Sequence, residues 1–284
     1  MKRPILLLIG MHALMAFGQE GWLSPGKFFF RIRDVATIRF RAGDPFSAQN
    51  WNGNREDIHR LAHCGPSGGF VDMAAAVSAA KGDSVRLPLS EEGTHMVVFN
   101  STSRFRALSA DSFNTYLAAA GLETILAYRR AHNETDKTGS GYLQQSSKTI
   151  FQVGGQVTDA CLRPSLLPLD IVPETNPYII PVGTDRTKPI RLRFQLLFLG
   201  NPVDDALVKT WYLDSAGRTR MDAARTGKRG WVTLTRHPGP CVVNCVYMQR
   251  LEGGQAQWQL YQASLSFEFS RFFPGNSAIY TREH

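Results

Sequence analysis

The most regular part of this 284-residue chain is the stretch YQASLSFEFS, residues 261–270. Tyr261 and every second residue up to Phe269 form an apolar row, and the residues between them, together with Ser270, form a polar row. Successive side chains of a β-strand point to opposite faces, so this period of two predicts a half-buried strand. The stretch IRLRFQLLF, residues 190–198, shows the same period. Both stretches predict strands that lay one apolar face against a facing sheet.

Turn sequences separate shorter β-prone segments around these two stretches. The further predicted strands of the second half cover residues 207–213, 219–224, 231–235 and 241–248. Short strands repeated at intervals of about 8–12 residues are typical of an antiparallel β-sandwich. The sequence therefore predicts such a sandwich for the second half.

The first half also begins with β-prone segments, but a helical passage interrupts it. Predicted strands lie within residues 27–40, 58–64 and 96–100. Ser109 can cap a helix that Gly121 ends, and a second helix extends to about Ala131, so a helical hairpin is predicted at about 109–131. The polar residues 133–147 predict a flexible connection, and the proline-rich residues 163–189 predict the route into a second domain.

The N-terminus has the three parts of a secretion signal. A basic start at Lys2 and Arg3 precedes an apolar run from Ile5 to Phe17, and small residues up to Gly18 suit a cut before Gln19. The run is short for a bilayer core of about 30 Å, and no later stretch is long enough to span one. We therefore expect export to the periplasm, cleavage after Gly18 and no transmembrane segment in the mature chain.

These features predict a mainly β protein of two antiparallel β-sandwich units. The predicted parts are a signal peptide at 1–18, an N-terminal β domain at 19–160, a C-terminal β-sandwich domain at 161–270 and a tail at 271–284.

The positive charge is modest and scattered. The formal net charge is +8, and loss of Lys2 and Arg3 lowers it to +6. Basic residues such as Arg39 and Arg41 alternate with Ile38 and Phe40, as on the solvated face of a strand. We therefore expect no nucleic-acid partner.

Four cysteines leave the redox state open. Cys64, Cys161, Cys241 and Cys245 allow two disulfides in three pairings. Cys241 and Cys245 lie on one predicted strand, about 13 Å apart, beyond the reach of about 7 Å for a disulfide. Two disulfides would therefore each link one of them to the first half, and buried free thiols are the alternative.

One segment matches the nucleophile-elbow pattern of hydrolases. It runs from Gly65 through Pro66 and Ser67 to Gly69. That motif needs a strand-to-helix turn on a parallel sheet, which the chain does not predict, whereas Gly-Pro sequences form β-turns readily. No phosphate-binding or dinucleotide-binding glycine pattern occurs. The sequence favours a protein that is not an enzyme, with a hydrolase using Ser67 as the less favoured reading.

Histidines supply the candidate metal ligands. His59 and His63 would converge on one ion if they lay on a helix, but would stand about 13 Å apart on a strand. With His95 they form the candidate set for a divalent metal ion. Surface histidines are the alternative.

Several segments together resemble a known family. They are Gln19–Pro25 with Phe28, Ser109–Leu126, Leu162–Pro164 with Val172–Pro173, Phe198–Pro202, Val246–Met248 and Trp258–Phe267. In this order and spacing they resemble a bacterial periplasmic family of unknown function that was earlier linked to nickel or cobalt uptake. The similarity runs from about Gln19 to Phe269.

The resemblance implies two β-sandwich units, the second similar to prealbumin-like or immunoglobulin-like domains, and a role in metal handling near the outer membrane. Family members usually carry histidine where this chain has Gln19 and Tyr247. Amide and phenol groups are poorer ligands than imidazole for borderline metals. We therefore predict a periplasmic, non-enzymatic binding or scaffold protein, with an envelope transport protein as candidate partner. The alternative is a nickel- or cobalt-binding accessory of metal uptake.

Overall fold

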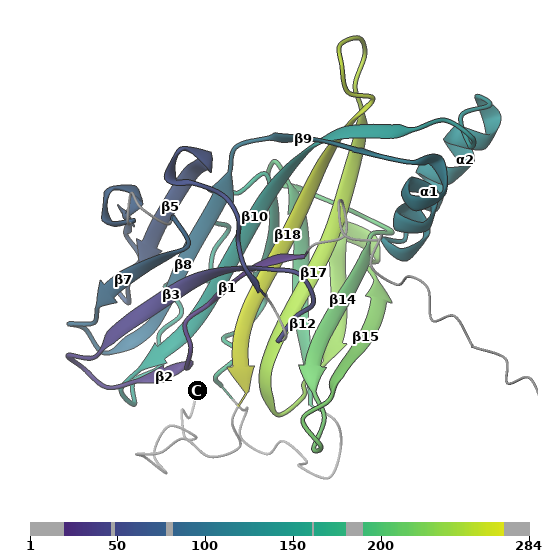
Figure 1. Cartoon of the computed structure of the whole chain (residues 1–284). Coiled ribbons are helices and arrows are strands. Elements are labelled where there is room, and N and C mark those ends of the chain that lie inside the picture. The colour runs from purple at the N-terminus through teal and green to yellow at the C-terminus, as the bar shows by residue number, and fades with distance from the viewer. Residues whose placement is uncertain (1–19, 47–48, 78–81, 161, 180–189, 270–284) are drawn as a thin grey trace, which may run out of the picture.

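The computed structural model describes residues 20–46, 49–77, 82–160, 162–179 and 190–269. This part of the chain is mainly β, as predicted (Figure 1). Its strands form three sheets. Two α-helices, α1 (Ala110–Ala119) and α2 (Glu123–Ala131), occur among the described residues.

A ten-stranded sheet forms the centre of the molecule. Its main path is β15 (Thr219–Arg225), β14 (Leu207–Leu213), β17 (Gly239–Arg250), β18 (Trp258–Phe269), β10 (Gly139–Val153), β8 (Gly93–Ser101), β5 (Ile58–Cys64) and β6 (Phe70–Asp72). Two shorter strands, β2 (Phe29–Phe30) and β9 (Arg104–Leu108), also pair with β10.

Two four-stranded sheets accompany it. Sheet A contains β1 (Gly21–Ser24), β3 (Val35–Ala42), β4 (Gln49–Asn50) and β7 (Ser84–Pro88). Sheet C contains β11 (Leu169–Pro173), β12 (Arg191–Phe198), β13 (Asn201–Pro202) and β16 (Trp231–Thr235). Short 3₁₀ turns occur at η1 (Arg55–Asp57), η2 (Ala74–Ala76) and η3 (Lys228–Gly230).

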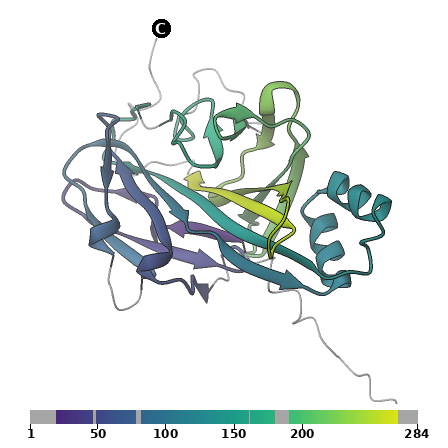
Figure 2. The ribbon, with the colours of Figure 1, turned by 90° about the horizontal axis from the view of Figure 1, so that it is seen from above.

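The central sheet is buried on both faces. Along β8, Met96 and Val98 belong to one apolar cluster with sheet C, whereas Val97 and Phe99 belong to another with sheet A. Alternate residues of a strand face opposite ways, so these clusters lie on opposite faces of the sheet. Figure 2 accordingly shows the yellow strand β18 between the purple strands of sheet A and the green strands of sheet C.

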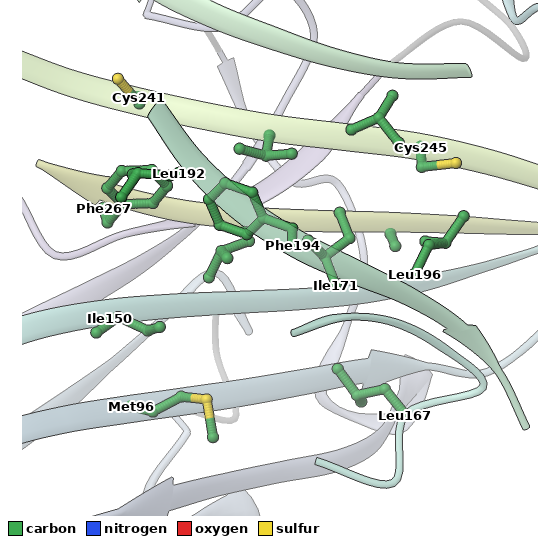
Figure 3. Close-up of a cluster of buried hydrophobic side chains, with 14 of the residues drawn as sticks. Met96, Ile150, Leu167, Ile171, Leu192, Phe194, Leu196, Cys241, Cys245 and Phe267 are labelled. Atoms are coloured by element: carbon green, nitrogen blue, oxygen red, sulfur yellow. The ribbon is translucent and has the colours of Figure 1, made fainter. Parts of the chain in front are cut away.

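The apolar cluster beneath sheet C confirms that residues 190–198 and 261–269 are strands with one buried face. Figure 3 shows the β12 side chains Leu192, Phe194 and Leu196 packed over the central sheet, which contributes Phe267 from β18. Burying an aliphatic or aromatic side chain of this size contributes about 1.5–3 kcal/mol, so this row accounts for much of the stability of the contact.

Parallel pairing at β10 and β18 corrects the prediction that the strands are antiparallel throughout. The pairing runs from Gly141 opposite Trp258 to Thr149 opposite Ser266. It joins the two halves of the chain in one sheet. The mainly β class is confirmed. The arrangement as two separate sandwich units is not confirmed, because one sheet contains strands of both halves. The boundary between residues 160 and 161 stays a prediction, and the predicted signal peptide and tail lie outside the described residues.

The polar segment 133–147 is not a flexible connection throughout, because β10 begins at Gly139. Its polar side chains are paired inside the fold: Asn100 Nδ2 donates to Ser146 Oγ at 3.2 Å, and Ser264 Oγ donates to Ser147 Oγ at 3.0 Å. Part of the proline-rich passage is likewise the buried strand β11, which pairs with β12. Composition misled the prediction here, since polar residues are stable in a buried strand once they are hydrogen-bonded.

The predicted helical hairpin is confirmed. Ser109 caps α1 by accepting a hydrogen bond from Ser112 N at 3.4 Å, and Gly121 follows α1 with a φ of 70°. Phe113 and Leu117 are buried in an apolar cluster with Trp258 and Leu260 of β18. The hairpin therefore closes one end of the central sheet.

Candidate binding site

A cleft of about 310 Å³ opens between β1 and the strand ends of the central sheet. Trp22, Leu23 and Ser24 of β1 form one side, and Val242 of β17 and Ser266 of β18 lie on the other. Its remaining lining residues are Gly26, Phe28, Arg41, Phe46, Leu213, Pro240, Cys241 and Glu268. Ligand sites are concave and combine apolar side chains with polar groups, and polar and apolar surfaces line this cleft in nearly equal parts.

Hydrogen bonds to serine and glutamine side chains hold β1 over the central sheet. Ser266 Oγ donates to the carbonyl oxygen of Leu23 at 2.6 Å, and Ser147 Oγ donates to that of Gly21 at 3.3 Å. The backbone nitrogen of Gly21 donates to Gln262 Oε1 at 3.3 Å. The polar side chains of β18 thus bind the backbone of β1 and fix it as one wall of the cleft.

The cleft carries one acidic and one basic side chain. Burial raises the pKa of Glu268 above its ordinary value. Arg41 donates through Nη1 to Asn50 Oδ1, which orients its guanidinium. An acid and a base at one cleft suit a ligand with groups of both charges.

The rim of the cleft contains backbone strain. Phe46 has a φ of 69°, a left-handed conformation that is unfavourable for a residue with a bulky side chain. Such strain costs about 1–3 kcal/mol and tends to be found at ligand clamps.

The structure brings two of the three predicted metal-ligand candidates together. His63 Nε2 lies 2.9 Å from His95 Nδ1, and the two rings stack with centroids 5.1 Å apart. His95 also stacks on Phe151, and its Nε2 lies 3.0 Å from the carbonyl oxygen of Glu91.

These contacts determine the tautomers. A carbonyl oxygen only accepts, so Nε2 of His95 carries the proton and Nδ1 of His95 accepts from Nε2 of His63. The remaining basic nitrogen of the pair is Nδ1 of His63. Burial, and then the neighbouring His95, lower the pKa of His63 to about 4, and burial lowers the pKa of His95. The pair is therefore neutral at pH 7.

The third candidate, His59, is exposed and lies beside the irregularity between Ile58 and Arg60 in the pairing of β5 with β8. Among the described residues, no group of three or more His, Cys, Asp or Glu side chains is placed to hold a metal ion. Of the three predicted metal ligands, the structure therefore brings His63 and His95 together and leaves His59 apart.

Ser67 is exposed in a turn between two antiparallel strands, β5 and β6. Gly68 N donates to the carbonyl oxygen of Gly65 at 2.9 Å, as in the β-turn that the sequence favours. A nucleophile elbow joins a strand to a helix, so the hydrolase geometry is absent at this segment.

Cys241 and Cys245 are buried free thiols. Burial raises the pKa of each to about 12, which keeps them protonated and unreactive. The predicted alternatives were disulfides to the first half or buried free thiols, and this pair has free thiols. Cys64 is buried, and Cys161 lies outside the described residues.

Tyr247, one of the two positions at which the resemblance implied a histidine, is partly buried and packs against the core beneath sheet C. Its ring lies 4.6 Å from that of Phe198, and both belong to the cluster that includes Tyr261. The other position, Gln19, lies outside the described residues.

The polar members of the cleft escaped the sequence analysis. Glu268 was expected on the polar row of its strand, and Arg41 on a solvated strand face. The available signal for the cleft was Trp22, the fourth residue after the predicted cut, because an aromatic residue so near a chain end needs a packing partner.

The fold and the cleft define a mainly β protein with a candidate small-molecule site. The chain belongs to the family described as "Domain of unknown function (DUF4198)", whose model matches residues 16–249. The predicted resemblance to a family of unknown function is thereby confirmed. No curated protein matches the chain.

Solved structures show only distant likenesses. A tetra-tandem repeat from the extending region of a large adhesion protein is 12% identical, with a TM-score of 0.21 over 88% of this chain and 50% of that one. Trypsin-activated alpha-2-macroglobulin from Escherichia coli is 11% identical, with a TM-score of 0.23 over 88% and 15% of the two chains. The D0-D1 domain of Intimin is 13% identical, with a TM-score of 0.20 over 88% and 98%. The chain thus spans half or less of the first two. Scores this low define neither the sheet arrangement nor the function.

Among the described residues, no helix combines the length and the apolar character needed to cross a membrane.

Proposed function

We propose that this protein is an exported, non-enzymatic binding protein that holds a small solute in the cleft beneath β1. The observation that carries the proposal is the cleft of about 310 Å³ with Trp22 and Phe28 beside Arg41 and Glu268. This volume lies at the lower end of the usual range of ligand pockets, about 300–1,000 Å³.

The lining favours a small zwitterionic solute with an apolar side. Arg41 suits a carboxylate, because a guanidinium binds it through two parallel hydrogen bonds. Glu268 suits an ammonium group, and a bound cation would favour its charged form against the effect of burial. Trp22 and Phe28 would cover an apolar side chain. Amino acids and dipeptides have this combination.

Export is the second part of the proposal. The predicted cut after Gly18 lies just before β1, which begins at Gly21 and packs against the central sheet. We expect N-terminal sequencing of the periplasmic protein to begin at Gln19. A chain that retains Met1, or that stays in the cytoplasm, would contradict export.

The binding proposal is tested on the mature chain by thermal shift and calorimetry with a panel of amino acids and dipeptides. At least one solute should raise the melting temperature, and Glu268→Gln and Arg41→Gln should each weaken its binding about tenfold or more, as expected for a lost charged hydrogen bond. Glu252→Gln, at an exposed site, is the matched control. Equal binding by Glu268→Gln would exclude the cleft, and no response to any solute would exclude this ligand class.

Metal binding is the second candidate function, and the contact between His63 and His95 is the observation that favours it. In this candidate, Nδ1 of His63 would be the first ligand, and the chain would serve nickel or cobalt uptake with an envelope transport protein. Titration with nickel, cobalt, zinc and copper by calorimetry tests it, with His63→Gln as the variant and His59→Gln as the exposed control. Affinities weaker than about 100 μM for all four metals, near −5.5 kcal/mol, would remove this candidate.

A further inference from the structure

One end of sheet C concentrates backbone strain. Seven described residues other than glycine have a left-handed φ, and four of them lie in the loops at this end. They are Leu166 (60°), Leu199 (49°), Asp205 (56°) and Arg229 (60°). A left-handed leucine is unfavourable because its Cβ approaches the carbonyl oxygen, and such strain clusters at functional sites.

Hydrogen bonds place these loops side by side. Leu199 N donates to the carbonyl oxygen of Pro168 at 2.8 Å, which sets the β12–β13 turn against the segment that carries Leu166. On the other side, Gln195 Nε2 donates to the carbonyl oxygen of Arg229 at 3.0 Å, and Gly230 N donates to Asp204 Oδ1 at 2.8 Å. The loops thus form one continuous edge, which we name the sheet C tip and define as residues 163–168, 199–205 and 228–230.

The tip presents apolar side chains to solvent. Leu166 is 84% exposed and Leu199 is 64% exposed, the two largest values among the exposed large hydrophobic residues of the described chain. Their neighbours Leu167 and Leu197 are buried, so the backbone turns the two leucines outward while it keeps adjacent apolar residues inside.

The tip also contains cationic side chains. Lys228 and Arg229 are exposed, and neither makes an ion pair with a described residue. Arg163 is exposed as a residue, but its Nη2 donates to the carbonyl oxygen of Gly68 and its guanidinium lies over the Phe70 ring. Of the two acids of the tip, Asp205 pairs with Arg225 at 3.4 Å, and Asp204 accepts from the backbone nitrogen of Gly230. Three cationic side chains against these two carboxylates give the tip a formal charge of +1.

We propose that the sheet C tip docks this protein on an anionic phospholipid surface, with Leu166 and Leu199 inserted among the headgroups. Lys228 and Arg229 then lie against lipid phosphates. Exposed leucines with flanking cations supply the two attractions that interfacial membrane binding combines.

A lipid surface fits the tip better than a protein interface does. A stable protein interface buries about 800 Å² on each partner around a packed centre. Two single leucines on narrow turns offer far less apolar area, but such protruding side chains can enter the headgroup region without a shaped partner.

Vesicle co-sedimentation of the mature chain tests the proposal. The vesicles contain phosphatidylcholine alone or with about 30 mol% phosphatidylglycerol, at about 1 mM accessible lipid. We expect binding to the anionic vesicles that falls with added salt, and little binding to the neutral ones. Leu166→Asn and Leu199→Asn should each lower the partition coefficient about tenfold, and Lys228→Gln with Arg229→Gln should remove the preference for anionic lipid. Val71→Thr, at a 63% exposed residue of β6, should bind as the unaltered protein does.

Thermal unfolding separates a docking role from a structural one. Asparagine tolerates the left-handed conformation, so Leu199→Asn should melt at the same temperature as the unaltered protein or above it, while it binds vesicles more weakly. The proposal is overturned if the unaltered protein binds no anionic vesicles, or if the double leucine variant binds equally well. Capture of an envelope protein by a photo-crosslinker at position 199, without vesicle binding, would overturn it in favour of a protein interface.

Discussion

The Glu20 carboxyl group lies beside β14 at the start of β1, where the charged form is disfavoured. Burial raises its pKa to about 7, against the opposing effect of nearby Lys209. The ordinary value is 4.5, so the stability that this group contributes below pH 4.5 is lost as the pH rises through 7.

Glu20→Gln should therefore stabilise the protein at pH 8 by about 2 kcal/mol and have little effect at pH 4.5. Urea unfolding of both proteins at the two pH values measures this. The exposed Glu252→Gln change should leave stability the same at both. A Glu20→Gln variant that is less stable than the unaltered protein at pH 8 would mean that the charged carboxylate is favoured.

His63 makes the stability depend on pH in the opposite direction from Glu20. Its pKa falls from 6.5 to about 4, so the stability it contributes is present above pH 6.5 and is lost as the pH falls through 4. His63→Gln keeps a donor for His95 Nδ1 but does not titrate in this range. Between pH 7.5 and pH 4.5, the unaltered protein should lose about 2 kcal/mol more unfolding free energy than the His63→Gln variant does. Parallel acid denaturation curves for the two proteins would show that His63 is not buried as described.

At the scale of elements, a buried ion pair joins the central sheet to sheet C. Lys148 of β10 pairs with Asp170 of β11, and their side chains are 1% and 3% exposed. Asp170 Oδ2 also accepts from Ser165 N at 2.6 Å and from Ser165 Oγ at 2.8 Å. A charge left alone at this depth loses hydration without compensation, so the pair acts as a unit.

Asp170→Ala should consequently destabilise the protein by about 3–5 kcal/mol, because Lys148 is left buried and charged. Lys148→Met combined with Asp170→Ala should cost less than the two single changes added together. A double-mutant cycle on urea unfolding free energies measures the difference. Simple additivity would show that the two side chains do not interact.

At the scale of the whole molecule, the central sheet joins the two halves of the chain. Strands β10 and β18 pair side by side although Ser147 and Ser264 are 117 residues apart in sequence. On the main path of the sheet, each of these strands has one neighbour from its own half of the chain and one from the other half. The folded unit is therefore expected to be the entire mature chain.

We accordingly expect unfolding in one cooperative transition. Trp51, in the cluster beneath sheet A, and Trp258, in the cluster beside the helices, report on different parts of the core. With each as the sole tryptophan, the two urea curves should share one midpoint. A fragment of residues 19–160 should lack stable tertiary structure by near-ultraviolet circular dichroism. Separate midpoints, or a folded fragment, would support the predicted boundary at 160 and 161.

The sequence by itself determined the alternating strands at residues 190–198 and 261–269, the face of each that is buried, and the position of the helical hairpin. These properties depend on side-chain alternation, capping and turn residues over a few neighbouring positions, as in residues 190–198 and at Ser109. Tertiary structure alone decided that polar β10 is a central strand, that His63 meets His95, and that Trp22, Arg41 and Glu268 border one cleft. Each of these contacts joins segments distant in the chain, and pairing across such a distance depends on how the sheets stack, which no local pattern records.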